Sequence, residues 1–268
     1  MNHSVQRIFM LAGIVLLTAC SAIAPETATP VPFTPTASIT PSPTATIVWF
    51  PPTNTPTLAP TRIIEPTEEM NPGLGSVLVE DAFIPGSNWS TGRFQAGNVV
   101  AVDQSLTLAV QEPKGFLLSL LSMPVLDSFD LQVNVDVSLC RDEDSYGILI
   151  RAASEWDYYR FLVNCQGFAR AERIRNSQTT LMQDWTRAGV IPGAPVTNKL
   201  EIWALGKEMR FFVNDSFIFS VSDPVFSSGQ AGVFARSGGE NAMTVNYSNM
   251  VIRSLNSSAL IRTATPAP

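Results

Sequence analysis

The chain has 268 residues, of which 15% are charged and 20 are proline, and its formal net charge is −6. No basic cluster is large enough to neutralise a run of phosphates, so we expect no nucleic-acid partner. The only histidine, His3, lies in a segment that we expect to be removed. A mature chain without histidine excludes a Ser-His-Asp triad, a Cys-His nucleophile pair and a His-ligated metal site.

The N-terminus is typical of an export signal. A short polar start is followed by the apolar run Ile8–Leu17, which is too short to span a bilayer but suits the apolar core of a signal peptide. The next residues, Leu17-Thr18-Ala19-Cys20, resemble the lipobox of bacterial lipoproteins. This resemblance implies cleavage after residue 19 and a diacylated Cys20 that anchors an exported protein to the membrane, facing outward. An ordinary secretory signal with an incidental cysteine is the alternative.

Residues 20–72 are predicted to form a disordered, lipid-anchored linker. Ser21–Pro72 contains twelve prolines and twelve threonines, and proline removes a backbone donor and favours extended geometry in the residue before it. Polyproline-like extension at about 3.1 Å per residue gives a reach on the order of 160 Å at most. We expect residues 256–268, which have a similar composition, to be a disordered tail.

Residues 73–255 show short alternating segments separated by turn signals, which predicts an all-β fold. The expected strands are Val77–Phe83, Asn98–Val102, Ser105–Val110, Gly115–Leu121, Leu131–Leu139, Tyr146–Arg151, Tyr158–Cys165, Phe168–Arg175, Thr179–Trp185, Leu200–Leu205, Glu208–Val213, Phe217–Val221, Gly229–Arg236 and Thr244–Ile252. So many short strands in one domain indicate a two-sheet antiparallel β-sandwich of jelly-roll type.

Two segments allow a finer prediction. In Leu131–Leu139 every second residue is apolar, which predicts a strand with one buried and one polar face. In the hairpin formed by Glu208–Val213 and Phe217–Val221, aligning the apolar rows requires pairing residue 213 with 217 and 211 with 219. We therefore expect a three-residue loop, Asn214-Asp215-Ser216, with one residue in the left-handed region.

Several motifs resemble the concanavalin A-like lectin/glucanase superfamily, near its laminin-G-like and 3-keto-disaccharide hydrolase-like branches. They are Asp81-x-Phe83 with Trp89, Tyr146–Arg151, Tyr158–Phe161, Trp185, Asn198-x-Leu200, Phe212–Asn214 and Gly229–Phe234. The resemblance covers most of Val77–Ile252 and concerns positions that form the fold, so it indicates architecture more than function.

Cys140 and Cys165 follow two of the predicted strands. If these strands and Tyr146–Arg151 form one meander, both cysteines lie at the same end of the sheet, and an exported domain favours a disulfide. Alternate strands of a sheet are about 9.6 Å apart, so this bond requires the loop after Cys140 to fold over.

The candidate ligand-binding residues are aromatic, basic and polar. Aromatic rings stack on sugars and arginine offers a fork of donors, so Trp156, Tyr158, Arg160 and Arg151 could bind a glycan together with Asn134 and Asp136 on one polar sheet face. A solvated face with aromatics packed under loops is the alternative. We expect Trp185 and Trp203 to lie in the core.

The candidate metal site is the loop Asp142-Glu143-Asp144, whose carboxylates could hold Ca²⁺; a solvated acidic loop is the alternative. No other cofactor is expected. Retaining glucanases of the resembled superfamily carry Glu-x-Asp-x-x-Glu, but the string starting at Glu155 ends in Arg160, so a two-carboxylate mechanism has no support.

The sequence therefore favours a monomeric, lipid-anchored, non-catalytic module that binds a glycan or an envelope polymer. Two alternatives remain open. One is a glycoside-processing hydrolase of the 3-keto-disaccharide hydrolase type, and the other is a surface domain for protein interaction or sensing.

Overall fold

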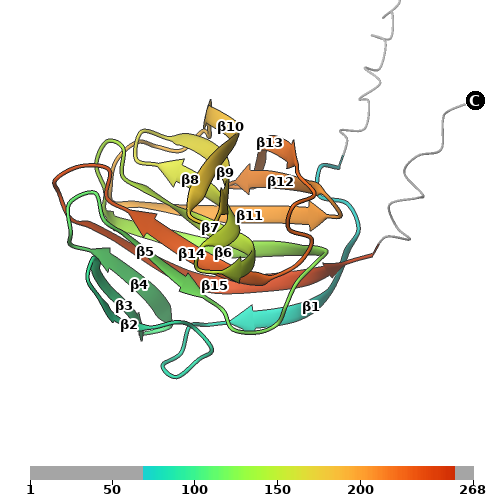
Figure 1. Ribbon diagram of the computed structural model, residues 1–268, viewed down its shortest axis with the longest axis horizontal. Helices are drawn as coiled ribbons and strands as arrows, with labels where there is room; N and C mark the ends of the chain where they lie inside the picture. Colours follow the sequence, from blue (N-terminus) through green and yellow to red (C-terminus); the bar gives the residue numbers. More distant parts are fainter. Residues whose placement is uncertain (1–68, 257–268) are drawn as a thin grey trace, which may run out of the picture. The chain divides into compact units, whose positions relative to one another are not determined.

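The computed structural model describes residues 69–256, all of which form strands, turns and loops (Figure 1). The predictions of a signal peptide and a lipidated Cys20 lie outside the described residues, as do residues 20–68 of the linker predicted over 20–72 and residues 257–268 of the tail predicted over 256–268. Residues 69–72 of the predicted linker are described, and Asn71 and Pro72 make hydrogen bonds with the folded domain. No helix in the part of the chain that the structure describes is long and apolar enough to cross a membrane.

Two antiparallel sheets form a sandwich, as the sequence predicts. The larger sheet contains nine strands in the order β13-β12-β11-β6-β15-β4-β3-β2, with β1 also paired to β15, and the smaller sheet contains six in the order β10-β9-β8-β7-β14-β5. The strands are β1 (Leu74–Asp81), β2 (Gly92–Phe94), β3 (Gly97–Val102), β4 (Ser105–Val110), β5 (Phe116–Leu120), β6 (Phe129–Leu139), β7 (Ser145–Ser154), β8 (Asp157–Asn164), β9 (Phe168–Arg175), β10 (Gln178–Arg187), β11 (Val196–Leu205), β12 (Glu208–Val213), β13 (Ser216–Ser222), β14 (Gln230–Arg236) and β15 (Met243–Leu255).

One layer of apolar side chains fills the space between the sheets. The β6 row Leu131, Val133, Val135 and Val137 is at most 1% exposed, as its alternation predicts, whereas Leu139 at the strand end is 38% exposed. Phe161 of the smaller sheet packs against Phe211 and Phe219 of the larger one, with ring centroids 5.6 and 6.4 Å away. Burying such side chains drives the two sheets together.

A buried tyrosine joins the two sheets by hydrogen bonds. The Tyr247 hydroxyl, on β15, lies 2.6 Å from the Phe234 carbonyl oxygen and accepts a hydrogen bond of 3.0 Å from the Gly147 N–H. Glycine is required at position 147 because a Cβ there would meet the Phe161 carbonyl oxygen at 1.9 Å. The close approach of β7 and β8 therefore leaves no room for a side chain at position 147. The phenol, which is inside the core, has its hydrogen-bonding groups satisfied by the backbone.

The β12–β13 hairpin differs from its prediction. The structure pairs Val213 with Ser216 across a two-residue loop in which Asn214 and Asp215 both have positive φ. A bulge between Phe211 and Phe212 then restores the pairing of residues 211 and 219, which was predicted correctly. The tight turn and the bulge together achieve the alignment for which a longer loop was expected.

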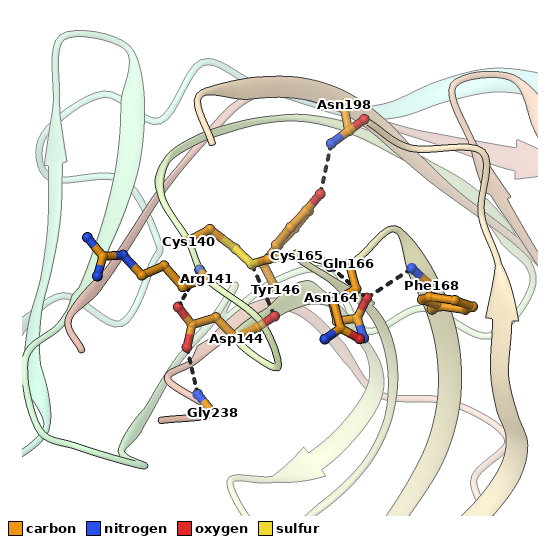
Figure 2. Close-up of a disulfide and its surroundings, with 10 residues drawn as sticks. All are labelled: Cys140, Arg141, Asp144, Tyr146, Asn164, Cys165, Gln166, Phe168, Asn198 and Gly238. Carbon is orange, nitrogen blue, oxygen red and sulfur yellow. Dashed lines mark hydrogen bonds between the residues drawn. A yellow bond between two sulfur atoms is a disulfide. The ribbon is translucent and has the colours of Figure 1, made fainter. Parts of the chain in front are cut away.

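The disulfide between Cys140 and Cys165 is present, but the meander that was expected to position it is wrong. Strand β6 belongs to the larger sheet and β7 and β8 to the smaller one, so the chain changes sheet at residues 141–144. The two Cα atoms are 5.9 Å apart because the bond ties the ends of the two sheets together (Figure 2).

Asp144 fixes this crossover. Its carboxylate accepts hydrogen bonds of 2.8 Å from the backbone N–H groups of Arg141 and Gly238 (Figure 2). On the core side, Asn198 donates to the Tyr146 hydroxyl at 2.8 Å and accepts a hydrogen bond from Asn214. The sheet ends are therefore held by both a covalent bond and satisfied buried polar groups.

Removing the disulfide by the double substitution Cys140→Ser and Cys165→Ser should lower the free energy of unfolding by about 3 kcal/mol, because the bond closes a loop of 25 residues in the unfolded chain. Urea unfolding of the variant and of the wild type, with and without reductant, measures this. A wild type that loses no stability on reduction would contradict the prediction.

The outer face of the larger sheet contains a buried carboxylate pair. Asp130 and Glu201 are at most 2% exposed, and Asn71 donates to Glu201 at 2.8 Å. Burial, followed by the nearby Glu201, raises the pKa of Asp130 to about 8. Trp203 is buried, as predicted, but on this outer face and not in the layer between the sheets: it lies on β11 opposite Asp130 and donates to the Pro72 carbonyl. Residues 71 and 72 thus pack onto Glu201 and Trp203 on this face.

The native protein should lose stability as the pH rises from about 4 to about 8. The unfolded chain releases the Asp130 proton near pH 4 while the native chain retains it to about pH 8, so the native state binds more protons over this range. Asp130→Asn should remove most of this slope. Urea midpoints measured across the range test the prediction, and an unchanged slope in the variant would contradict it.

Candidate functional site

The outer face of the six-stranded sheet carries the candidate site. On β8, Tyr159 and Phe161 point into the core, so Tyr158, Arg160 and Leu162 face outward, as the alternation predicts. On the neighbouring strand β9, Ile174, Glu172 and Arg170 lie directly opposite these three residues. Two strands thus place arginines on both sides of a carboxylate.

An ion triad occupies the centre of this face. The Glu172 carboxylate lies 2.5 Å from Arg160 Nε and 2.8 Å from Arg170 Nε, and its side chain is only 5% exposed. Arg160 also stacks over the Phe234 ring at 5.0 Å, and Arg170 over the Trp185 ring at 5.4 Å. One carboxylate therefore orients two guanidinium groups, each supported by an aromatic ring.

Two hollows lie on this face, one beside each arginine. The first has a volume of about 440 Å³ and is lined by Arg170, Glu172 and Trp185 together with Asn164 and Phe168. The second has a volume of about 390 Å³, and its aromatic and basic lining residues are Phe116, Trp156, Tyr158, Lys114, Arg160 and Arg236. Arg236, at the end of β14, lines both hollows.

Three of the six predicted ligand-binding residues come together in the second hollow: Trp156, Tyr158 and Arg160. Trp156 is 55% exposed, whereas Tyr158 is 3% exposed and burial raises the pKa of its phenol. Trp156 lies in the β7–β8 turn, which is held by Asp157 through hydrogen bonds from the Ser154 hydroxyl and the Asn176 N–H. The fixed turn presents the indole at the rim of the hollow.

The other three predicted residues lie elsewhere, so the expected single polar face is wrong. Asn134 and Asp136 are on β6 of the larger sheet, where Asp136 accepts a hydrogen bond from the Thr197 hydroxyl. Arg151 has a positive φ at a bulge in β7 and is 1% exposed, bound to the carbonyl oxygens of Asp127 and Phe226. The bulge breaks the alternation that would have directed Arg151 outward.

Sequence reasoning missed much of the site. Trp185, expected in the core, is 37% exposed and lines the first hollow. Arg170 and Glu172 could have been found from the sequence, because they alternate with the small apolar residues Ala169 and Ala171. In the structure both alanines are fully buried. Arg236 and Phe116 have no such signal, since their position depends on the pairing of β14 with β5.

The acidic loop does not form a set of converging carboxylates. Both Asp144 oxygens accept backbone hydrogen bonds, while Asp142 and Glu143 are exposed. Within residues 69–256, the only cluster of three potential metal ligands joins Asp144 to Cys140 and Cys165, whose sulfurs form the disulfide. Calcium binding at this loop stays a prediction.

Comparisons with known proteins identify the fold. No family model matches the sequence, and no curated protein matches it either. A Bacillus subtilis protein of unknown function with a galectin-like fold superposes with a TM-score of 0.50 at 13% identity, covering 68% of this chain and 98% of its own. A structure from a study of endo-acting O-glycanases of the human gut microbiota also gives 0.50, at 10% identity, covering 68% and 100%.

A carbohydrate-binding module from Bacillus subtilis gives a TM-score of 0.49 at 14% identity, covering 63% of this chain and 96% of its own. At these identities the likeness concerns the fold alone. The described domain is an all-β, two-sheet sandwich similar to galectin-like structures.

Replacing the central carboxylate should destabilise the domain. Glu172→Gln leaves two arginines without their shared counter-ion and should lower the free energy of unfolding by about 2 kcal/mol. Glu143→Gln, an exposed carboxylate on the same face, should change it by less than about 0.5 kcal/mol. Equal effects of the two substitutions in urea unfolding would contradict the role of the triad.

Proposed function

We propose that this chain is a non-catalytic glycan-binding module, held on the outer side of a membrane by its N-terminal lipid. The observation that carries the binding function is the second hollow, where three aromatic side chains and two arginines converge on an open sheet face. Aromatic rings offer faces for the C–H surfaces of sugars, and guanidinium groups donate several hydrogen bonds to hydroxyls.

The exposure of Trp156 supports binding. Because the Trp156 ring is 55% exposed, it contributes little to the stability of the fold. The turn that carries it is already fixed by the Asp157 hydrogen bonds. An exposed aromatic residue beside Phe116 and Tyr158, in a concave site with convergent polar groups, has the composition of a ligand site.

The carboxylates of this face support a non-catalytic role. Glycoside hydrolysis requires two carboxyl groups facing the same bond, one as acid and one as nucleophile or base. Glu172 is bound by two arginines, Asp157 is bound within its turn, and Glu155 and Glu143 line different hollows. A hydrolase would need a carboxylate pair elsewhere.

Trp156→Ala should weaken glycan binding about tenfold with little loss of stability, because it removes the stacking ring and this ring is more than half exposed. A glycan array with the full-length protein identifies a ligand, and calorimetry measures the affinity of wild type and variant. Phe94→Ala serves as the control. It also removes an exposed aromatic ring, which is 44% accessible and lies on β2 of the other sheet. No binding to any glycan on the array would overturn the proposal.

The anchor is proposed from the lipobox alone, since two acyl chains hold a protein stably at a bilayer where one does not. Cys20→Ser should release the protein from the membrane fraction into the medium, as measured by fractionation and immunoblotting of cells producing each form. Retention of the variant in the membrane fraction would contradict lipidation at this residue.

A further inference from the structure

The second hollow is positively charged although the protein is acidic. Lys114, Arg160 and Arg236 line it, and Glu155 is its only acidic lining residue. The chain as a whole has a formal net charge of −6. This local reversal of charge lies on the outer face of the six-stranded sheet, beside the three aromatic rings.

Arg236 differs from the other two arginines that line the hollows. Arg160 and Arg170 share the carboxylate of Glu172, whereas Arg236 forms no ion pair with any residue between 69 and 256. It is exposed and lies between the two hollows, opposite Phe116 on β5 and Ser145 on β7. Its guanidinium is thus open to an anion from solution.

The lysine of the hollow adds to this charge. Lys114 lies 3.6 Å from Glu240, and the two side chains are 69% and 75% exposed, so the pair is weak and screened by water. The triad, in contrast, already carries one positive charge in excess, because two arginines share one carboxylate. The cations therefore exceed the anions next to Trp156.

We propose that this hollow selects an anionic sugar, with the Trp156 ring stacking on its pyranose face and Arg236 binding its carboxylate or sulfate group. The inference rests on the proposed glycan-binding function and specifies its ligand class. A planar guanidinium pairs with a carboxylate or sulfate through two parallel hydrogen bonds, which a neutral hydroxymethyl group cannot replace. Discrimination between acidic and neutral glycans follows from this contact.

The test compares three oligosaccharide probes of matched length with the full-length protein by calorimetry: oligogalacturonate, a sulfated carrageenan fragment and neutral galactan. We expect the anionic probes to bind at least tenfold more tightly than galactan. Their affinity should fall as salt is raised, since the contact is partly exposed. Preference for oligogalacturonate assigns the subsite to carboxylate, and preference for the carrageenan fragment assigns it to sulfate.

Arg236→Gln should weaken binding of the preferred anionic probe about tenfold and leave galactan within twofold. Arg93→Gln makes the same charge change on β2 of the other sheet and should leave both affinities within twofold. If both variants lost the same affinity for the anionic probe, the effect would follow from net charge alone, and the proposal would be overturned.

The two proposals fail in different ways. If galactan or another neutral glycan binds as tightly as the anionic probes and Arg236→Gln has no effect, the glycan-binding function stands and the anionic specificity is wrong. If neither these probes nor a glycan array gives binding, the glycan-binding function itself is wrong.

Discussion

Packing of two sheets through one apolar layer is the constraint on which the rest of this domain depends. Side chains alternate along each strand. When one residue points into that layer, its two neighbours in the strand therefore point to an outer face. Tyr159 and Phe161 belong to the layer, so Arg160 has to point outward between them. The candidate site thus follows from the burial of residues that never touch it.

The two outer faces use charge in different ways. On the larger sheet, Asp130 and Glu201 are buried next to one another, and one of them retains its proton at neutral pH. On the smaller sheet, Glu172 is buried between two arginines, which satisfies the carboxylate and leaves positive charge at the surface. The first arrangement is closed to solvent, whereas the second borders two hollows.

Local patterns in the sequence are sufficient to predict the strands but not how they are divided between sheets. The alternation of apolar and polar residues predicts β6 and β8 correctly, and it also predicts that the Arg160 side chain points outward. The sheet change at residues 141–144 leaves no periodic signal, so Asn134 and Asp136 were grouped with residues of the other sheet. The three-residue strand β2 is too short for a pattern and was not predicted.

Bulges and long-range strand pairing account for the other differences between the predicted and the observed structure. A two-residue shift in the pairing of β7 with β8 redirects Arg151, and a one-residue shift in the β12–β13 hairpin changes the loop before Ser216. Arg236 enters the site because β14 lies between β5 and β7, a contact between segments far apart in the chain. Such long-range pairing depends on how all the strands pack against the core, and a short stretch of sequence does not contain this information.

The most direct test of the account is to map a bound glycan by NMR on the isotopically labelled protein. If the glycan binds in the second hollow, the indole N–H of Trp156 and the guanidinium signals of Arg160 and Arg236 should shift on titration, together with backbone signals of β8 and β14. The indole of Trp203 and the backbone of β6 and β11, on the other sheet, should stay unchanged. Shifts confined to β6 and β11 would place binding on the opposite face and contradict the account.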